Sequence, residues 1–191
     1  MALVIRLVAV LLCGVACGRG IADGPTDAAA DPVVAIPERP GGDAGFFERV
    51  AIVVAGPLEG TLGGAAPQLE HTLFDGVSFL SIAGRDPRLA VELRFHYTGK
   101  PPAGRAFDET SPGFSCQLSV VDNGDPGGSW IARTAARDES ARGRCAITLD
   151  SVEYLWTGHG AEGYRVSGTV RGTLEPGVGT PGGPLALAAR F

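Results

Sequence analysis

The chain has 191 residues, of which 29 are Gly and 14 are Pro, with 45% hydrophobic residues, 19% charged residues and a formal net charge of −5. Gly and Pro are about twice as frequent as usual, which excludes a coiled coil or helical bundle, and the hydrophobic content excludes a fully disordered chain. The acidic balance offers no basic surface for DNA or RNA, so we expect no nucleic-acid partner.

Residues 1–16 have the layout of a secretory signal peptide. One positive charge, Arg6, precedes an apolar run of about ten residues that ends in small residues. This run is shorter than the ~20 residues that a transmembrane helix needs. We therefore expect residues 1–16 to be removed after export.

The segment Gly14–Cys17, with the sequence GVAC, resembles the lipobox of bacterial lipoproteins. The resemblance covers the signal region alone, and Gly14 stands where that family usually has Leu. It implies that Cys17 is diacylated, becomes the N-terminus and anchors the protein to a membrane of the cell envelope. The alternative is ordinary signal-peptidase cleavage and secretion, because Gly14 and Ala16 also satisfy the small-x-small rule. The number of cysteines favours lipidation. Cys13 leaves with the signal, and if Cys17 takes the lipid, Cys116 and Cys145 remain as a pair with no thiol left over.

Residues 17–45 have the composition of a linker. Four prolines interrupt any helix or strand, and acidic residues outnumber large apolar ones. We expect a flexible tether between the lipid and a folded domain. The alternative is a tail that packs on the domain through the apolar patch at residues 33–36.

Residues 46–191 alternate between apolar and polar positions in many short runs, separated by Gly-, Asn- and Pro-rich turns. Such a pattern without crossover helices predicts an all-β domain, an antiparallel β-sandwich or barrel of about 8–10 strands. Residues 129–136 are the least certain strand, because their alanines also suit a short helix. The predicted strands are 49–55, 69–74, 77–83, 89–97, 114–120, 129–136, 145–149, 164–174 and 185–191.

The alternation also predicts irregularities in the last long strands. Gly168 and Gly172 fall on the apolar face of 164–174, which indicates a bend, a bulge or a large group packed opposite. After residue 149 the apolar phase shifts, which predicts a bulge near Asp150–Ser151. This shift places Val152, Tyr154 and Trp156 on one face.

Cys116 and Cys145 both lie on the apolar faces of their predicted strands. A disulfide between them would close a loop of about 30 residues and contribute roughly 3.6 kcal/mol in the chain-entropy model. The competing interpretations are two buried thiols and a metal site, but two cysteines without a nearby His or Cys partner make a poor zinc site.

Motifs that carry chemistry are scarce. His71, His96 and His159 lack metal-ligand spacing and are each expected to be solvated. The chain has no nucleophile elbow, phosphate-binding loop or dinucleotide fingerprint, so we expect no catalytic residues, cofactor or metal site. The oxygen-rich segment 122–125 suits a hairpin turn, with a calcium site as the alternative.

Aromatic residues around 154–164 leave one functional hypothesis open. Tyr154 and Trp156 are expected in the core, but exposed on a β-domain they would stack on sugar rings. The sequence therefore predicts a cell-envelope lipoprotein with a structural or binding β-domain, no catalysis and an unidentified protein or glycan partner. The alternative is a secreted carbohydrate-binding module that uses Tyr154, Trp156 and Trp130, and an envelope hydrolase is a third.

Overall fold

The computed structural model describes residues 34–37, 50–63, 68–134 and 140–191. The expected signal peptide, Cys17 and most of the expected tether lie outside these residues. The described residues form eleven strands and no helix, and every strand pairing is antiparallel. The strands are β1 (Ala51–Ala55), β2 (Gly60–Gly63), β3 (Gln68–Phe74), β4 (Val77–Arg85), β5 (Leu89–Thr98), β6 (Arg105–Asp108), β7 (Phe114–Asp122), β8 (Gly128–Arg133), β9 (Arg144–Gly158), β10 (Ala161–Pro176) and β11 (Leu185–Arg190).

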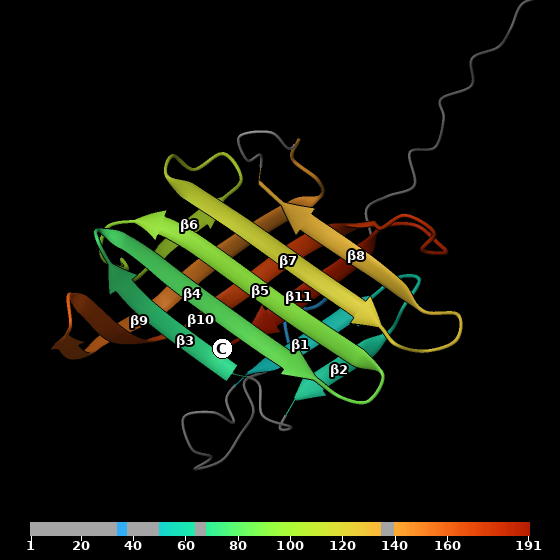
Figure 1. Cartoon of the computed structure of the whole chain (residues 1–191), viewed down its shortest axis with the longest axis horizontal. Coiled ribbons are helices and arrows are strands. Elements are labelled where there is room, and N and C mark those ends of the chain that lie inside the picture. The colour runs from blue at the N-terminus through green and yellow to red at the C-terminus, as the bar shows by residue number, and fades with distance from the viewer. Residues whose placement is uncertain (1–33, 38–49, 64–67, 135–139) are drawn as a thin grey trace, which may run out of the picture. The chain divides into compact units, whose positions relative to one another are not determined.

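The strands form two layers, which are visible one behind the other in Figure 1. The front layer has the order β3-β4-β5-β7-β8, and the back layer has the order β2-β1-β11-β10-β9-β6. The long strand β10 joins the layers, because its first residues pair with β3 and its last residues pair with β8. The predicted antiparallel all-β fold is confirmed.

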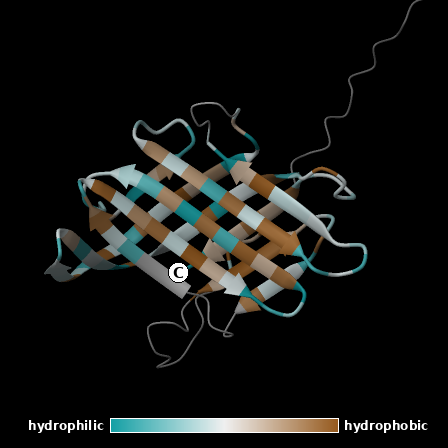
Figure 2. Cartoon of the chain, in the orientation of Figure 1, coloured by the Kyte–Doolittle hydropathy of each residue, from teal (hydrophilic) through white to brown (hydrophobic). Residues whose placement is uncertain are grey.

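Alternating side chains explain why these segments form strands with one buried face. In β5, Leu93, Phe95 and Tyr97 point inward and are buried, whereas Arg94 and His96 between them are exposed. Figure 2 shows the same alternation as hydrophilic and hydrophobic bands along the front strands. A period of two residues is the requirement for a strand that is buried on one face.

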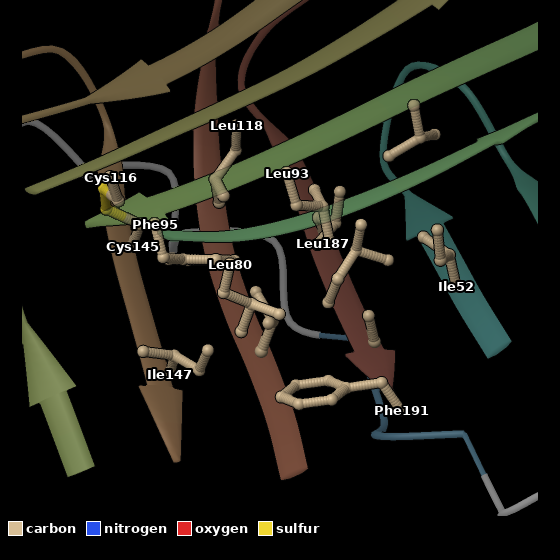
Figure 3. Close-up of a cluster of buried hydrophobic side chains, with 14 of the residues drawn as sticks. Ile52, Leu80, Leu93, Phe95, Cys116, Leu118, Cys145, Ile147, Leu187 and Phe191 are labelled. Atoms are coloured by element: carbon tan, nitrogen blue, oxygen red, sulfur yellow. A yellow bond between two sulfur atoms is a disulfide. The ribbon is translucent and has the colours of Figure 1, made fainter. Parts of the chain in front are cut away.

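The core lies between the two layers and is built from branched aliphatic and aromatic side chains (Figure 3). Leu118 of β7 approaches Gly172 of β10 so closely that a Cβ at Gly172 would collide with it. The predicted disulfide is present, since Cys116 of β7 is bonded to Cys145 of β9. It therefore ties the front layer to the back layer.

Two short strands account for the difference between the eleven observed strands and the predicted 8–10. Both β2 and β6 have only four residues, too few to show an alternating pattern. The uncertain segment forms the strand β8 over Gly128–Arg133, while residues 135–139 lie outside the described part of the chain.

The long strand β9 contains two bulges. The expected one is confirmed, because Ser151 pairs with Ser167 and Leu149 pairs with Gly168, which leaves Asp150 unpaired. A second bulge leaves Leu155 unpaired between Tyr154 and Trp156. No shift in the apolar alternation predicts this second bulge.

One residue of the apolar patch at 33–36, Val34, lies beside strands of the domain. Val34 lines a hollow of about 370 Å³ together with Arg171, Thr173 and Ala186 on β10 and β11. Residues Asp31–Phe191 form one compact unit. Val34 is the residue of the 33–36 patch that lines this hollow, and the packed-tail alternative stays a prediction.

Candidate functional site

Two hollows lie along the outer face of the hairpin β4–β5. The first, of about 280 Å³, is bordered by Phe79, Ser81 and Arg94, and the second, of about 410 Å³, lies further along beside Ala83 and Ala90. Register pairs from Phe79 with His96 to Arg85 with Ala90 connect them on the same face. We call the outward side chains of residues 79–85 and 90–96 the β4–β5 trough.

Small side chains make the floor of the trough low. Ser81 and Ala83 on β4 face outward beside Ala90 on β5, and Ser119 on β7 extends the floor sideways. The same strands carry Leu80, Ile82 and Leu93 on their inner faces. Each of the three small residues of β4 and β5 faces a long side chain across the strand pair, Ser81 opposite Arg94, Ala83 opposite Glu92 and Ala90 opposite Arg85.

An ion pair separates the two hollows. The Arg94 guanidinium donates two hydrogen bonds to Oε1 of Glu92, at 2.8 Å from Nε and 2.5 Å from Nη2. Arg94 borders the first hollow and Glu92 borders the second. Because the side chains are half exposed, this pair contributes little to stability, but it fixes donors and an acceptor within the trough.

His96 closes one end of the trough beside Phe79. Their rings meet edge to face with centroids 4.8 Å apart. Partial burial, helped by the positive charge of Arg94, lowers the pKa of His96 below its ordinary value of 6.5. At pH 7 the imidazole is therefore neutral and offers one donor and one acceptor.

An aromatic row continues sideways from this end of the trough. Trp156 pairs with Gly163, Gly163 with Thr72, Thr72 with Phe79 and Phe79 with His96, so that all five face outward. A Cβ at Gly163 would collide with the Trp156 indole, which means that the ring rests on the glycine backbone. The row therefore presents separate rings on one side of five strands.

The expected core position of Tyr154 and Trp156 is wrong, because both are about half exposed, at 55% and 49%. Their expected placement on one face is wrong as well. Tyr154 pairs with Tyr164, whereas Trp156 pairs with Gly163, and consecutive residues of β10 point to opposite faces. The bulge at Leu155 causes this reversal.

Trp130 occupies a different environment from Tyr154 and Trp156. Its ring is buried, and its Nε1 donates a hydrogen bond to the carbonyl oxygen of Gly183 at 3.2 Å. The structure therefore does not bring Trp130 to a surface with the other two rings. Sugar binding by this trio stays a prediction.

His71 differs from the expectation for histidines. It is buried between Tyr97 and Tyr164, and its Nε2 shares a short hydrogen bond with the Tyr97 hydroxyl. Burial lowers the pKa of His71 to about 4 and raises the pKa of Tyr97. His96 and His159, in contrast, are exposed as expected.

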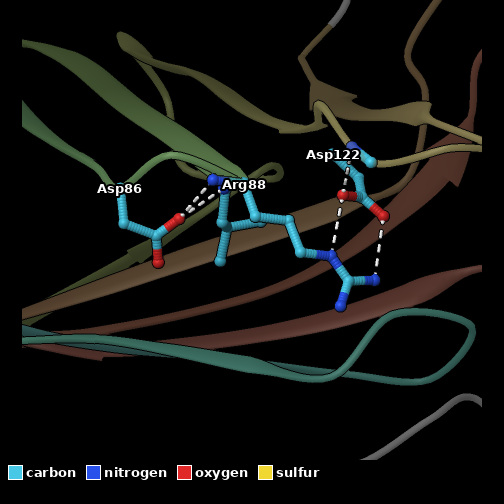
Figure 4. A network of polar contacts seen from close by, with 5 residues as sticks. Asp86, Arg88 and Asp122 are labelled. Atoms are coloured by element: carbon cyan, nitrogen blue, oxygen red, sulfur yellow. Dashed lines mark hydrogen bonds and ion pairs between the residues drawn. The ribbon is translucent and has the colours of Figure 1, made fainter.

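The segment 122–125 forms a turn that is fixed by an arginine (Figure 4). The carboxylate of Asp122 accepts hydrogen bonds from Nε and Nη2 of Arg88, at 3.0 and 3.2 Å, and a third from the backbone of Gly124. These hydrogen bonds, that from Arg88 above all, lower the pKa of Asp122. A calcium ion would have to displace a guanidinium here, so the geometry favours the turn over the calcium alternative.

Within the described residues, no group of three or more His, Cys, Asp or Glu side chains is placed to hold a metal ion. That part of the chain also has no helix of the length and apolarity needed to cross a membrane. Cys17, the expected site of lipid attachment, lies outside it.

The sequence analysis missed the trough, although a signal was present. The outward positions of 77–83 and 89–97 hold Ser81, Ala83 and Ala90, where solvated strands usually carry longer polar side chains. What could not be read from the sequence is the pairing of β4 with β5, which brings the outward faces of the two strands side by side. Comparisons with protein-family models, with curated proteins and with solved structures found no match, so the trough itself carries the functional argument.

Proposed function

We propose that this protein is a cell-envelope lipoprotein, anchored through Cys17, whose β-domain is a binding module without catalytic activity. The observation that carries the binding role is the β4–β5 trough, a hollowed surface with Arg94 and Glu92 between its two hollows and His96 at one end. Surface hollows lined by a few converging polar groups are the usual form of a ligand site.

A role without catalysis is supported by two of the titratable groups with shifted pKa values, His71 and Asp122, which lie away from the trough; the shifted group at the trough, His96, packs against Phe79. General acids and bases need access to a substrate as well as a shifted pKa. His71 has the shifted pKa but is enclosed in the core. Asp122 is held by Arg88, and neither group borders the trough.

The anchor is tested by growing cells with an alkyne-bearing palmitate and detecting the label on the protein. We expect label on the native chain and none on Cys17→Ala. The matched control is Cys13→Ala, which removes a cysteine from the expected signal peptide and should keep the label. An unlabelled native chain, or label that persists in Cys17→Ala, contradicts the anchor.

The binding role is tested with a photo-reactive amino acid in place of Ser81, on the trough floor. We expect light-dependent adducts in intact envelopes. The control carries the same photo-reactive group in place of Val178, which is fully exposed outside the trough. The binding role is contradicted if position 81 yields no more adduct than position 178.

A further inference from the structure

We propose that the β4–β5 trough binds a neutral polysaccharide chain that lies along the strands. Phe79 stacks on a sugar ring at one end, and Arg94 and Glu92 form hydrogen bonds with sugar hydroxyl groups in the middle. This inference deepens the proposed binding role and rests on it. The site differs from the aromatic trio that the sequence indicated.

The shape of the trough suits a narrow, chain-like ligand. From His96 to Ala90 it follows six residue steps of β5, which is roughly 20 Å at about 3.4 Å per residue. Its two hollows follow one another along β4 and β5, and each reaches one strand further, the first to Thr72 of β3 and the second to Ser119 and Val121 of β7. A globular partner would need a broad contact of about 800 Å² on each side.

The backbone of the trough is unavailable to a peptide ligand. β4 pairs with β5 over its whole length and with β3 as far as Ala83, and β5 pairs with β4 and β7, so the strands are hydrogen-bonded along both edges over most of the trough. An extended peptide gains most of its affinity by adding a strand to a free edge. A ligand on this face must be recognised through side chains alone.

The charges of the trough favour a ligand without net charge. Arg94 is paired with Glu92, His96 is neutral at pH 7, and only Arg85 at the far end has no acidic neighbour on the facing residues of β5. A polyanion would require a basic surface. Hydroxyl groups of a sugar chain, in contrast, can accept from the guanidinium and donate to the carboxylate.

Phe79 supplies the apolar surface that the faces of sugar rings bury. Its side chain is 40% exposed even though His96 packs on its edge. The aromatic row extends this surface across Thr72 and Gly163 to Trp156, whose lower face is already covered by the glycine backbone. A longer chain that leaves the trough at Phe79 therefore meets a second ring.

The test is native affinity electrophoresis of the full mature chain in gels that contain laminarin, hydroxyethylcellulose, galactomannan or soluble starch. We expect at least one of these neutral polysaccharides to retard the native protein. Phe79→Ala and Arg94→Ala should each weaken that binding at least ~10-fold, as expected for residues at the centre of a site. Both side chains point outward, and an unchanged emission spectrum of buried Trp130 verifies that the variants fold.

The matched control is Tyr154→Ala, which removes an even more exposed aromatic ring, on the face of the β9–β10 hairpin opposite Trp156, and should leave retardation unchanged. The proposal is overturned if none of the four gels retards the native chain, or if the trough variants are retarded as strongly as the native chain. If no gel retards the chain but Cys17 carries the palmitate label, the polysaccharide proposal is rejected and the anchor is not. If a gel retards the chain but the chain carries no label, the anchor alone is rejected.

Discussion

Single residues in the core are set by close contacts that a hydropathy pattern only partly encodes. Gly168 was expected at a bend, a bulge or a tight contact, and it lies beside the bulge at Asp150. A Cβ there would collide with the carbonyl oxygen of Thr148 and lie 2.8 Å from the ring of Phe191. The glycine marks the position correctly, but the sequence could not identify Phe191 as the opposing group.

His71 shows what the sequence analysis overlooked at this scale. Its position in the alternating run 69–74 puts it in phase with Leu73, on the apolar face. The expectation that His71 is solvated rested on its residue type and not on its position in the alternation. The aromatic partners Tyr97 and Tyr164 come from distant strands and could not be predicted.

Buried His71 makes stability depend on pH in a defined window. Its pKa is about 4 when folded and near 6.5 when unfolded, so the unfolded state takes up a proton first as the pH falls. Its stabilising contribution is complete above pH 6.5 and is lost as the pH falls towards 4, by up to about 3 kcal/mol. Urea unfolding at several pH values should show this loss.

The control is His71→Gln, which keeps a hydrogen-bonding group for Tyr97 but cannot titrate. Its free energy of unfolding should change less between pH 6.5 and 4.5 than that of the native chain. Carboxylates with lowered pKa values, such as Asp122 and Glu162, lose their contributions below this window. Equal slopes for both proteins within it would rule out the proposed titration.

At the scale of elements, strand positions follow from the sequence better than strand faces do. The alternation located β4, β5, β7 and β11 to within a few residues. It failed in the second half of β9, because the bulge at Leu155 lies between two exposed aromatic residues and leaves no break in hydropathy. One inserted residue then exchanged the faces of every side chain after it.

The disulfide is the covalent link between elements of different layers. Its residues are 29 apart in sequence, so replacing both with Ser should lower the free energy of unfolding by about 3.6 kcal/mol. Chemical denaturation under non-reducing conditions measures this difference. The control is the native chain treated with a reductant, whose free energy of unfolding should fall by a similar amount. A double variant as stable as the oxidised native chain would contradict this stabilisation by the disulfide.

At the scale of the whole molecule, periodicity identifies strands but not their partners. The β4–β5–β7 order follows the chain, and turn chemistry supports it, but the pairing of β10 with β3 joins residues about 90 positions apart. No local signal specifies such a contact. The trough is predictable only once β4 and β5 are known to be adjacent, and the aromatic row only once β3, β9 and β10 are placed as well.

The central place of β10 has a consequence for the order of folding. Among the described strands β10 is the tenth of eleven, yet it pairs with β3, β8, β9 and β11. β1 can pair with β11 only after β11, the last described strand, has been synthesised. Contacts between such distant segments slow the search for the native state. A chain emerging from its N-terminus can form hairpins of the front layer, but it cannot complete the back layer until its final residues arrive. The back layer of the domain is therefore the last part of the described fold to be completed.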